Sequence, residues 1–490
     1  MRHEANDQIY NALDCCITFE VFEELCTLGN APPTIYSFER ALQAPVLEMM
    51  LRGWRVDEYE RRKALDDIRK KRTILQSKLN QMARAVWGGD LNARSPLQLR
   101  TFFYNYMRLP QILISQKGER KLAMNREALE RLDVYLLARP IISCILTIRD
   151  LNKQEEQFET LLDEDKRFRT SFNIAGTDTW RFSSSKSSTG TGGNIQNIKR
   201  DDDIGKGELS TRRPFVADAG FKLCEIDLEQ AESRECGWIF GCLYGNWDYL
   251  DACEQGDLHT TCAGLIWPGL VVDRASAEKL FYRHFTYRDM SKRGAHLTNY
   301  MGTAFTAARS LKVPQALMDK FQRDYATGPQ AAFPMFPKWW RWTAQELQIK
   351  RTLYNSFGVE RTFFDRPNDD ATLRAAIAHQ PQSATAMRTN LGLWKIWRYM
   401  PEVQVMAQRH DSVTFQFLEC DPDDEIKIVK KAQSYMTCPM TYKDRKFDVP
   451  CDAKTGWNWG GWDEKMNPDG MKKLKEPDKR TRRPDIERVL

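Results

Sequence analysis

The first half of the chain carries a helical pattern of hydrophobic residues. Between residues 36 and 82, apolar side chains recur at spacings of three and four, as at Leu42, Val46 and Met50. On an α-helix these spacings place the apolar side chains on one face. Gly53 interrupts the pattern, which therefore predicts one helix on each side of it.

The second of these helices is strongly basic over residues 61–72, which contain four Arg and three Lys. Such a helix could hold the phosphate backbone of a nucleic-acid duplex. A solvated helix face with ion pairs between residues four apart explains the same pattern and is commoner. Ser95, followed by Pro96, predicts the start of a further helix, and the helical pattern ends near Leu162.

Strand patterns dominate parts of the second half. Residues 221–227 alternate apolar and polar side chains and predict a β-strand that ends at Asp227. Residues 403–407 and 413–417 predict a hairpin with Asp411 in its turn. Residues 179–194 are rich in Ser, Thr and Gly and predict a loop.

Composition narrows the class of protein. The 490 residues, 42% of them hydrophobic, are enough for several domains. A net charge of +6 permits a nucleic-acid partner without requiring one. No apolar run approaches the roughly 20 residues that cross a bilayer, and no secretory signal opens the chain, so we expect a cytoplasmic protein. The twelve Cys lack the paired short spacings of a zinc site, and we expect reduced thiols.

Two aspartates are candidates for metal binding. Asp227 ends a predicted strand and Asp411 lies in a predicted turn. Two carboxylates from separate segments are the minimum that holds a pair of hard cations ~3.5–4 Å apart for phosphoryl transfer. Neither residue is diagnostic alone, because an Asp in a hairpin turn is ordinarily a turn residue.

A cationic helix is predicted over residues 288–302. Arg288, Lys292, His296 and Tyr300 recur every fourth residue and would share one helix face. Two permanent cations followed by two rings suit a triphosphate at one end and a base at the other. A solvated helix with a buried Tyr fits the spacing equally well.

Taken in order, these segments resemble the motifs of the family A DNA polymerases, the DNA polymerase I family. Each motif is weak alone, but their order and spacing, over residues 38–459, make the resemblance strong. The matching segments are Thr179-Trp180-Arg181-Phe182-Ser183-Ser184 (T-G-R-x-S-S), 194–198 (N-L-Q-N-I), 212–215, 227–234 (motif A, D-x-S-Q-I-E-x-R), 257–259 (D-I-H), 288–292 (motif B, R-x-x-x-K), 374–382 (a palm helix), 410–412 (motif C, H-D-E) and, for the thumb, 52–57 and 95–99.

The resemblance implies an α+β, right-hand polymerase fold with an antiparallel-sheet palm, helical fingers and a helical thumb. It also implies a template-directed DNA polymerase of DNA replication, which adds dNTPs to a primer 3′-hydroxyl. The expected division is a remnant of a 3′–5′ exonuclease domain (1–35), the thumb (36–165), the first part of the palm (166–257), the fingers (258–350), the second part of the palm (351–465) and a basic, partly disordered tail (466–490).

The resemblance further implies a two-ion site. Asp227 and Asp411, aided by the main-chain carbonyl of Leu228, would hold two Mg²⁺ ions, for which Mn²⁺ can substitute. One ion would lower the pKa of the primer 3′-hydroxyl, and the other would steady the leaving pyrophosphate.

Nucleotide and DNA contacts follow from the same resemblance. Arg288, Lys292 and His259 would hold the triphosphate, and Lys292 would protonate the leaving group. Tyr300 would stack at the nascent base pair, and Glu232 would exclude a ribonucleotide's 2′-hydroxyl. Primer-template contacts are expected from Arg181 and Gln382, in the minor groove, and from Gln196, Asn197, His410 and Arg361.

Four positions depart from the family pattern. His296 stands where Phe or Tyr is usual, which leaves discrimination against dideoxynucleotides open. Met301 takes the place of the Gly that usually follows the Tyr. Ser412 replaces the Glu of motif C and Glu229 replaces the Ser of motif A, so Glu229 could supply the lost carboxylate. We then expect Glu229→Ala to cut turnover strongly. Several departures resemble phage polymerases, for which the location would be the host cytoplasm.

The N-terminus resembles only the end of a proofreading nuclease. A helix is predicted over residues 10–28, before the breaker at 31–33, and Tyr10 to Asp14 match the last exonuclease motif, Y-x-x-x-D. The earlier motifs of that nuclease have no room ahead of it. We expect no proofreading by this chain alone, with the exonuclease lost, truncated or supplied by a separate subunit. A processivity subunit is a further possible partner.

Two other functions remain open from the sequence. A single-subunit RNA polymerase shares the palm and its two Asp, but Glu232 and the thumb segments argue against it. A catalytically silent primer-template-binding protein would not need Asp227, Asp411, Arg288 and Lys292 together.

Overall fold

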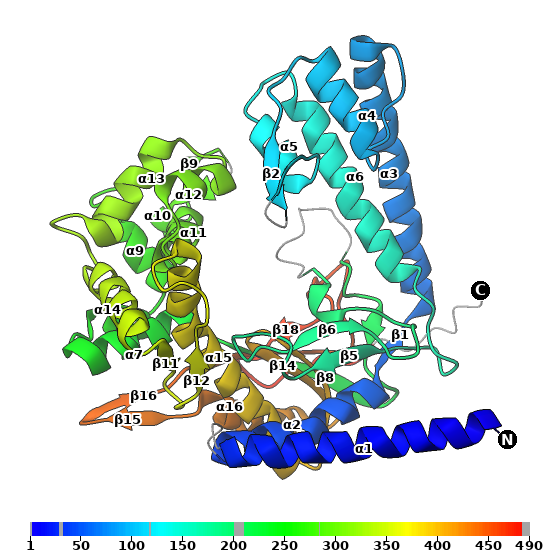
Figure 1. Cartoon of the computed structure of the whole chain (residues 1–490), viewed down its shortest axis with the longest axis vertical. Coiled ribbons are helices and arrows are strands. Elements are labelled where there is room, and N and C mark those ends of the chain that lie inside the picture. Colours follow the sequence, from blue (N-terminus) through cyan, green and yellow to red (C-terminus); the bar gives the residue numbers. More distant parts are fainter. Residues whose placement is uncertain (1, 29–32, 117–118, 200–209, 284, 483–490) are drawn as a thin grey trace.

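The computed structural model describes residues 2–28, 33–116, 119–199, 210–283 and 285–482. Two helical parts rise from the same side of a body built on a β-sheet (Figure 1). We call the part formed by residues 58–158 the arm and the part formed by residues 258–349 the lobe.

The central sheet has five antiparallel strands in the order β13-β14-β8-β17-β18. The predicted strand and hairpin are confirmed, as β8 (Phe221–Leu228) in the middle and as β13 (Val403–Arg409) with β14 (Ser412–Leu418) at one edge. At the other edge lie β17 (Cys451–Gly456) and β18 (Lys472–Lys473).

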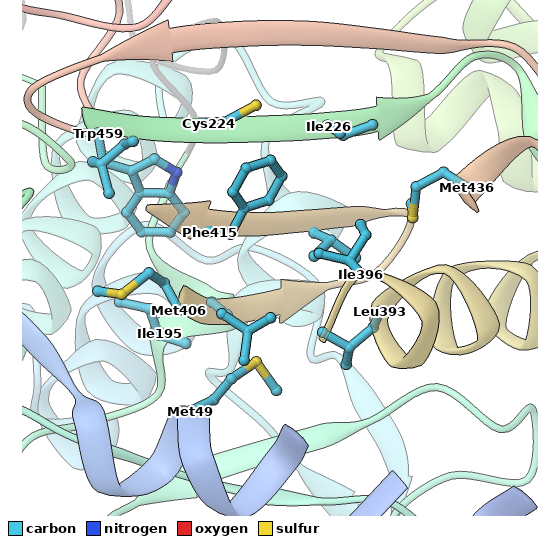
Figure 2. Close-up of a cluster of buried hydrophobic side chains, with 14 of the residues drawn as sticks. Met49, Ile195, Cys224, Ile226, Leu393, Ile396, Met406, Phe415, Met436 and Trp459 are labelled. Atoms are coloured by element: carbon cyan, nitrogen blue, oxygen red, sulfur yellow. The ribbon is translucent and has the colours of Figure 1, made fainter. Parts of the chain in front are cut away.

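Three helices pack against this sheet and share its core. They are α2 (Pro33–Arg52), α15 (Asp370–Tyr399) and α16 (Pro422–Thr437). Figure 2 shows Met49 of α2 meeting the side chains of the sheet from one side. Fully burying one such side chain contributes roughly 1.5–3 kcal/mol, so this core fixes the strands that carry Asp227 and Asp411.

The arm consists of two long helices, α3 (Glu58–Trp87) and α6 (Arg139–Phe158), which pack against each other. The helix predicted over 61–72 lies inside α3, where Arg69 and Arg72 form ion pairs with Glu155 of α6. Arg62 forms an ion pair with Glu58, four residues before it, as the ion-pair explanation expects. Binding of a duplex by this face stays a prediction. The tip of the arm contains α4 (Pro96–Arg100), η1 (Thr101–Tyr106), β2 (Leu113–Gln116), β3 (Glu119–Leu122) and α5 (Arg126–Leu132).

The lobe is helical and has its own aromatic core. Its core also includes Phe240 and Tyr249, which come from helices before residue 258. These two preceding helices are α7 (Ala231–Tyr244) and α8 (Asp248–Glu254). The helices of the lobe itself are α9 (Leu258–Ile266), α10 (Arg274–Ala277), α11 (Tyr287–Asn299), α12 (Ala304–Leu311), α13 (Gln315–Gln322), η4 (Arg323–Thr327) and α14 (Met335–Ile349).

Small antiparallel sheets of two or three strands lie outside the central sheet. The prediction that residues 179–194 form a loop is partly wrong. Strand β6 lies within this segment and pairs with β5, which precedes the segment, and η2 (Ile195–Asn197) follows it. Apart from β2-β3 of the arm, the small sheets are β4-β1-β7 (Arg167–Phe168, Trp54–Val56, Phe215–Val216), β5-β6 (Thr170–Asn173, Ser183–Lys186), β9-β10 (Leu280–Tyr282, Phe285–Thr286), β11-β12 (Thr352–Tyr354, Glu360–Thr362) and β15-β16 (Met440–Tyr442, Arg445–Phe447).

The two ends of the chain differ from each other. The N-terminal helix α1 (Arg2–Leu28) carries exposed apolar side chains, Tyr10 among them. The first part of the expected tail belongs to the fold: β18 joins the sheet, and Asp478 pairs with the buried Lys222 at 2.9 Å. Disorder at the end of the tail stays a prediction. Residues 483–490 lie outside the described part. Among the described helices, none combines the length and apolar character needed to span a membrane.

Candidate active site

The sheet register brings Asp227 and Asp411 together at the end of β8. Strand β14 pairs Ser412 with Asp227, and the Leu228 N–H donates a hydrogen bond of 3.0 Å to the Asp411 carbonyl. His410 has a φ of +54°, a left-handed conformation that turns the chain just before Asp411. Both aspartates are half-buried. Two carboxylates distant in sequence therefore lie on adjacent strand ends.

A third carboxylate that no motif marked lies on the other side of β8. Asp452 of β17 stands directly opposite Asp227, and Lys473 of β18 donates to it at 2.6 Å. The Glu229 carboxyl hydrogen-bonds to Asp452, and this bond, together with burial, raises the pKa of Glu229. The Ser412 hydroxyl instead donates to the Arg409 carbonyl. Glu229 is thus engaged with Asp452, and its role as a substitute carboxylate stays a prediction.

The donor set at Asp227 and Asp411 fits magnesium better than zinc. Within the described residues no three His, Cys, Asp or Glu side chains converge on one point, as a zinc site requires. Mg²⁺ is usually held by one or two carboxylates, with water and substrate phosphates as its other ligands. Two hard oxygen donors at an accessible strand end meet that description.

The cationic face of α11 borders a second part of the site. Arg288 donates two hydrogen bonds to Asp257, the residue before α9, at 2.7 and 2.9 Å. Lys292 and His296 are exposed. Burial, reinforced by Arg288 and Lys292 and opposed by Asp257, lowers the pKa of the neighbouring His259 to about 4. The helix thus presents permanent cations beside an imidazole that is neutral at pH 7.

Tyr300 ends the same helix face and reaches the start of α7. Its hydroxyl donates a hydrogen bond to Glu232, which also forms an ion pair with Arg181. Burial and the Glu232 carboxylate raise the pKa of Tyr300 well above its usual value, so the hydroxyl stays protonated. His296 lies one turn away, with its ring 5.2 Å from the Tyr300 ring. Three elements meet at Glu232.

Two further expected contacts lie around the loop that carries Arg181. Arg361 of β12 pairs with Asp178 of this loop at 2.7 Å, and Asn390 of α15 donates to the Trp180 carbonyl. Gln382, on α15 as well, is half-buried, and its amide forms no side-chain hydrogen bond with the described residues. The loop is therefore tied to both β12 and α15.

The Gln196 side chain points into the protein rather than toward solvent. It accepts a hydrogen bond from Ser184 at 2.8 Å and donates to the Gln408 carbonyl at 3.1 Å. The Gln408 amide in turn donates to the His410 carbonyl. Asn197 and His410 themselves are exposed. Gln196 thus supports the turn before Asp411, and its expected contact with DNA stays a prediction.

A cleft of about 960 Å³ opens between α6 of the arm and the β6–η2 region. Its lining includes Lys153, Lys186, Lys199 and Asn197. The three lysines are exposed and form no ion pair with other described residues. The sequence did not single them out, because isolated lysines carry no motif and their convergence depends on how the arm stands on the sheet.

Comparisons with known proteins agree with this geometry. The model of DNA polymerase family A matches residues 62–461. DNA polymerase I of Treponema pallidum is 24% identical over 86% of this chain, and the thermostable DNA polymerase I of Thermus aquaticus is 25% identical over 72% of it. The chain spans only about 40% of the length of these bacterial relatives.

A solved structure shares the fold. The POL domain of Pol1 from M. smegmatis, in complex with DNA primer-template and dNTP, superposes with a TM-score of 0.66 at 19% identity, over 86% of this chain and 69% of that one. The right-hand polymerase fold is thus as expected, with the central sheet as palm, the lobe as fingers and the arm as thumb. The expected domain bounds stay a prediction, and α2, which we expected within the thumb, packs against the central sheet. The family model covers most of the chain, and the chain therefore belongs to DNA polymerase family A.

Proposed function

We propose that this chain is a template-directed DNA polymerase that adds dNTPs to a primer 3′-hydroxyl with two Mg²⁺ ions bound at Asp227 and Asp411. The observation that carries the proposal is the pairing of β8 with β14, which joins the two aspartates at one strand end. When bound, the ions would activate the hydroxyl and neutralise charge on the phosphates. Mn²⁺ fits the same oxygen donors.

The cationic face of α11 would bind the triphosphate. Lys292 is exposed and free to meet phosphate oxygens, and an ammonium close to the leaving pyrophosphate can donate a proton to it. Arg288 would exchange its bonds with Asp257 for bonds with phosphate. His259 is uncharged at neutral pH, so it would contribute a neutral hydrogen bond rather than a third cation.

Sugar and base selection would centre on Glu232. Its carboxylate is held by both Tyr300 and Arg181, which leaves it little freedom to move aside for a 2′-hydroxyl. Tyr300 and His296 offer rings to the nascent base pair, and Arg181 and Gln382 would contact acceptor atoms in the minor groove. Such contacts sense the geometry of a pair without reading its sequence.

Duplex DNA would lie in the cleft between arm and sheet. Lys153, Lys186 and Lys199 supply cations for backbone phosphates, which dominate affinity for DNA. The expected contacts near the primer terminus remain Asn197, Gln196, His410 and Arg361. The phage-like character of the chain and a separate exonuclease or processivity subunit stay predictions.

Primer extension with Mg²⁺ tests the proposal. We expect wild type to extend a primed template with dNTPs, and Asp411→Asn to lose roughly a thousandfold in rate, because an ion's lost ligand is worth several kcal/mol. Asp423→Asn, which changes an exposed Asp on α16, is the matched control and should extend normally. No extension by wild type would refute the proposal, and a preference for rNTPs would favour an RNA polymerase.

A further inference from the structure

The tip of the arm touches the lobe. Arg309 of α12 lies 3.6 Å from Glu127 of α5, and Lys312, the residue after α12, lies 3.2 Å from Asp133, the residue after α5. We propose that these two ion pairs form a clasp that joins the arm to the lobe and so closes a ring around bound duplex DNA. The inference rests on the proposed function, because it takes DNA as the enclosed ligand.

The two ion pairs join the arm to the lobe, which are separate parts of the molecule. The contact therefore closes the gap between these parts instead of linking neighbours along the chain. The arm and the lobe both rise from the body that contains the central sheet, and the paired residues belong to α5 and α12 or directly follow them, at a distance from that body (Figure 1). In the same view α6 lies on the side of the arm that faces the lobe. The lysines of the cleft include Lys153 of α6. Body, arm, clasp and lobe therefore form a closed circuit, and α6, which carries Lys153, forms the side of the arm that faces the lobe.

The ion pairs of the clasp can break at low cost. Glu127 also pairs with Arg131 at 2.6 Å, and the Asp133 carboxylate lies 3.9 Å from the Arg139 guanidinium, also within the arm. Opening therefore leaves neither carboxylate without a cationic neighbour. Arg309, Glu127 and Lys312 are partly exposed, and ion pairs at exposed positions are weak and screened by salt. Duplex can enter through the open form, and the closed form then retains it.

If the clasp encloses the DNA, it should affect circular and linear templates differently. Phosphate contacts alone do not predict such a difference. A duplex with free ends can slide out of a ring lengthwise, but a primed circular template can leave only when the clasp opens. The clasp should therefore slow dissociation from circular DNA specifically. Ordinary phosphate contacts would slow dissociation from circular and linear templates alike.

The experiment compares dissociation rates of the full chain from a primed circular template and from a short linear primer-template, at low salt. Glu127→Arg places like charges together and should speed release from the circle by roughly threefold to tenfold, with no change on the linear duplex. Glu127→Arg combined with Arg309→Glu restores the pair with reversed sign and should restore slow release. Asp90→Arg makes the same charge change on the arm, at an exposed residue that pairs with Arg84 of α3 rather than with the lobe, and serves as the matched control.

Each result decides the question. Equal acceleration on circular and linear DNA, or no rescue by the reversed pair, would overturn the clasp and leave a general charge effect. Unchanged release by Glu127→Arg would overturn it as well. Failure of wild type to bind the linear primer-template would instead count against the proposed function, so the two failures are distinguishable. Thermal melting of each variant checks that the fold is intact.

Discussion

At the scale of single residues, Glu232 connects three elements through one carboxylate. It accepts from Tyr300 of the lobe and pairs with Arg181 of the loop before β6. A side chain held at two points keeps its position when a nucleotide arrives. In the proposed function, this arrangement would let the Glu232 carboxylate act as a barrier to a 2′-hydroxyl.

We therefore expect Glu232→Ala to relax sugar selection. Removing the side chain opens space beside the sugar and frees Tyr300, so rNTP incorporation should rise by roughly tenfold or more relative to dNTP incorporation. Single-nucleotide insertion kinetics with each substrate measure this ratio. Glu232→Gln keeps the volume and loses the charge, so it should retain most of the selection. Equal loss in both variants would show that charge rather than size selects the sugar.

Backbone conformation explains a family glycine that this chain lacks. Met301 follows Tyr300 with a φ of +57°, where non-glycine residues are strained by about 1–2 kcal/mol. Trp180 stands at the glycine position of the T-G-R motif and has a φ of +63°. Both positions require the left-handed conformation, whichever residue fills them.

Substitution of Met301 tests this explanation. We expect Met301→Gly to be more stable than Met301→Ala by about 1 kcal/mol, because only glycine relieves the strained φ while both variants lose the side chain. Urea unfolding of the two variants compares them directly. If Ala proved as stable as Gly, the conformation would carry no strain.

At the scale of elements, a buried ion pair joins α7 to α15. Arg388 and Glu235 are both fully buried and meet at 2.9 Å. Arg388 also donates to the carbonyls of Thr437 and Cys438 at the end of α16, and Ser356 donates to Glu235. Three helices that frame the sheet and the lobe are thus held in one orientation.

Breaking this pair should cost much more than removing it. Arg388→Met leaves a buried, unpaired Glu235 and should destabilise the protein by about 3–5 kcal/mol. Arg388→Met combined with Glu235→Met removes both charges and should recover part of that loss. Chemical denaturation measures both. A double variant less stable than the sum of the single ones would show that the pair itself is not the source of the cost.

At the scale of the whole molecule, ion pairs hold the C-terminal segment against the central sheet. Asp478 pairs with Lys222 of β8 and with Arg480, and Lys222 also pairs with Glu425 of α16. Burial alone would raise the pKa of Asp478, but hydrogen bonds from Arg480 and Lys222 outweigh it and lower the pKa to about 2. The segment expected to be a tail is therefore part of the fold.

This pKa predicts an acid-sensitive contribution to stability. A carboxyl whose pKa is lowered on folding stabilises the protein above its unfolded value near 4, and the contribution is lost as the pH falls toward 2. The stability difference between wild type and Asp478→Asn should thus be largest at pH 5 and shrink at pH 3. Urea unfolding at the two pH values measures it, with Glu476→Gln, an exposed change in the same segment, as control. A difference independent of pH would contradict the assignment.

The sequence predicted well where the signal is local. The hairpin around Asp411, the strand through Asp227 and the Ser95 cap follow from side-chain periodicity and turn chemistry, and the structure contains them. The helix predicted over 288–302 is present as well but ends at Asn299. The strand at 221–227 was predicted from its alternating apolar and polar side chains, but the structure gives the polar side chains a different environment from the one that alternation suggests. Its polar Lys222 and Glu225 are buried in ion pairs rather than exposed to solvent.

Family membership and the order of the motifs were determined by the sequence alone, because local pattern and residue identity carry both. Only the tertiary structure decided which residues meet. Asp452 and Lys473 reach the Asp227 site through strand register, and Glu127 meets Arg309 through the stance of the arm on the sheet. These contacts join segments with no shared periodicity, and their geometry depends on the packing of the whole molecule.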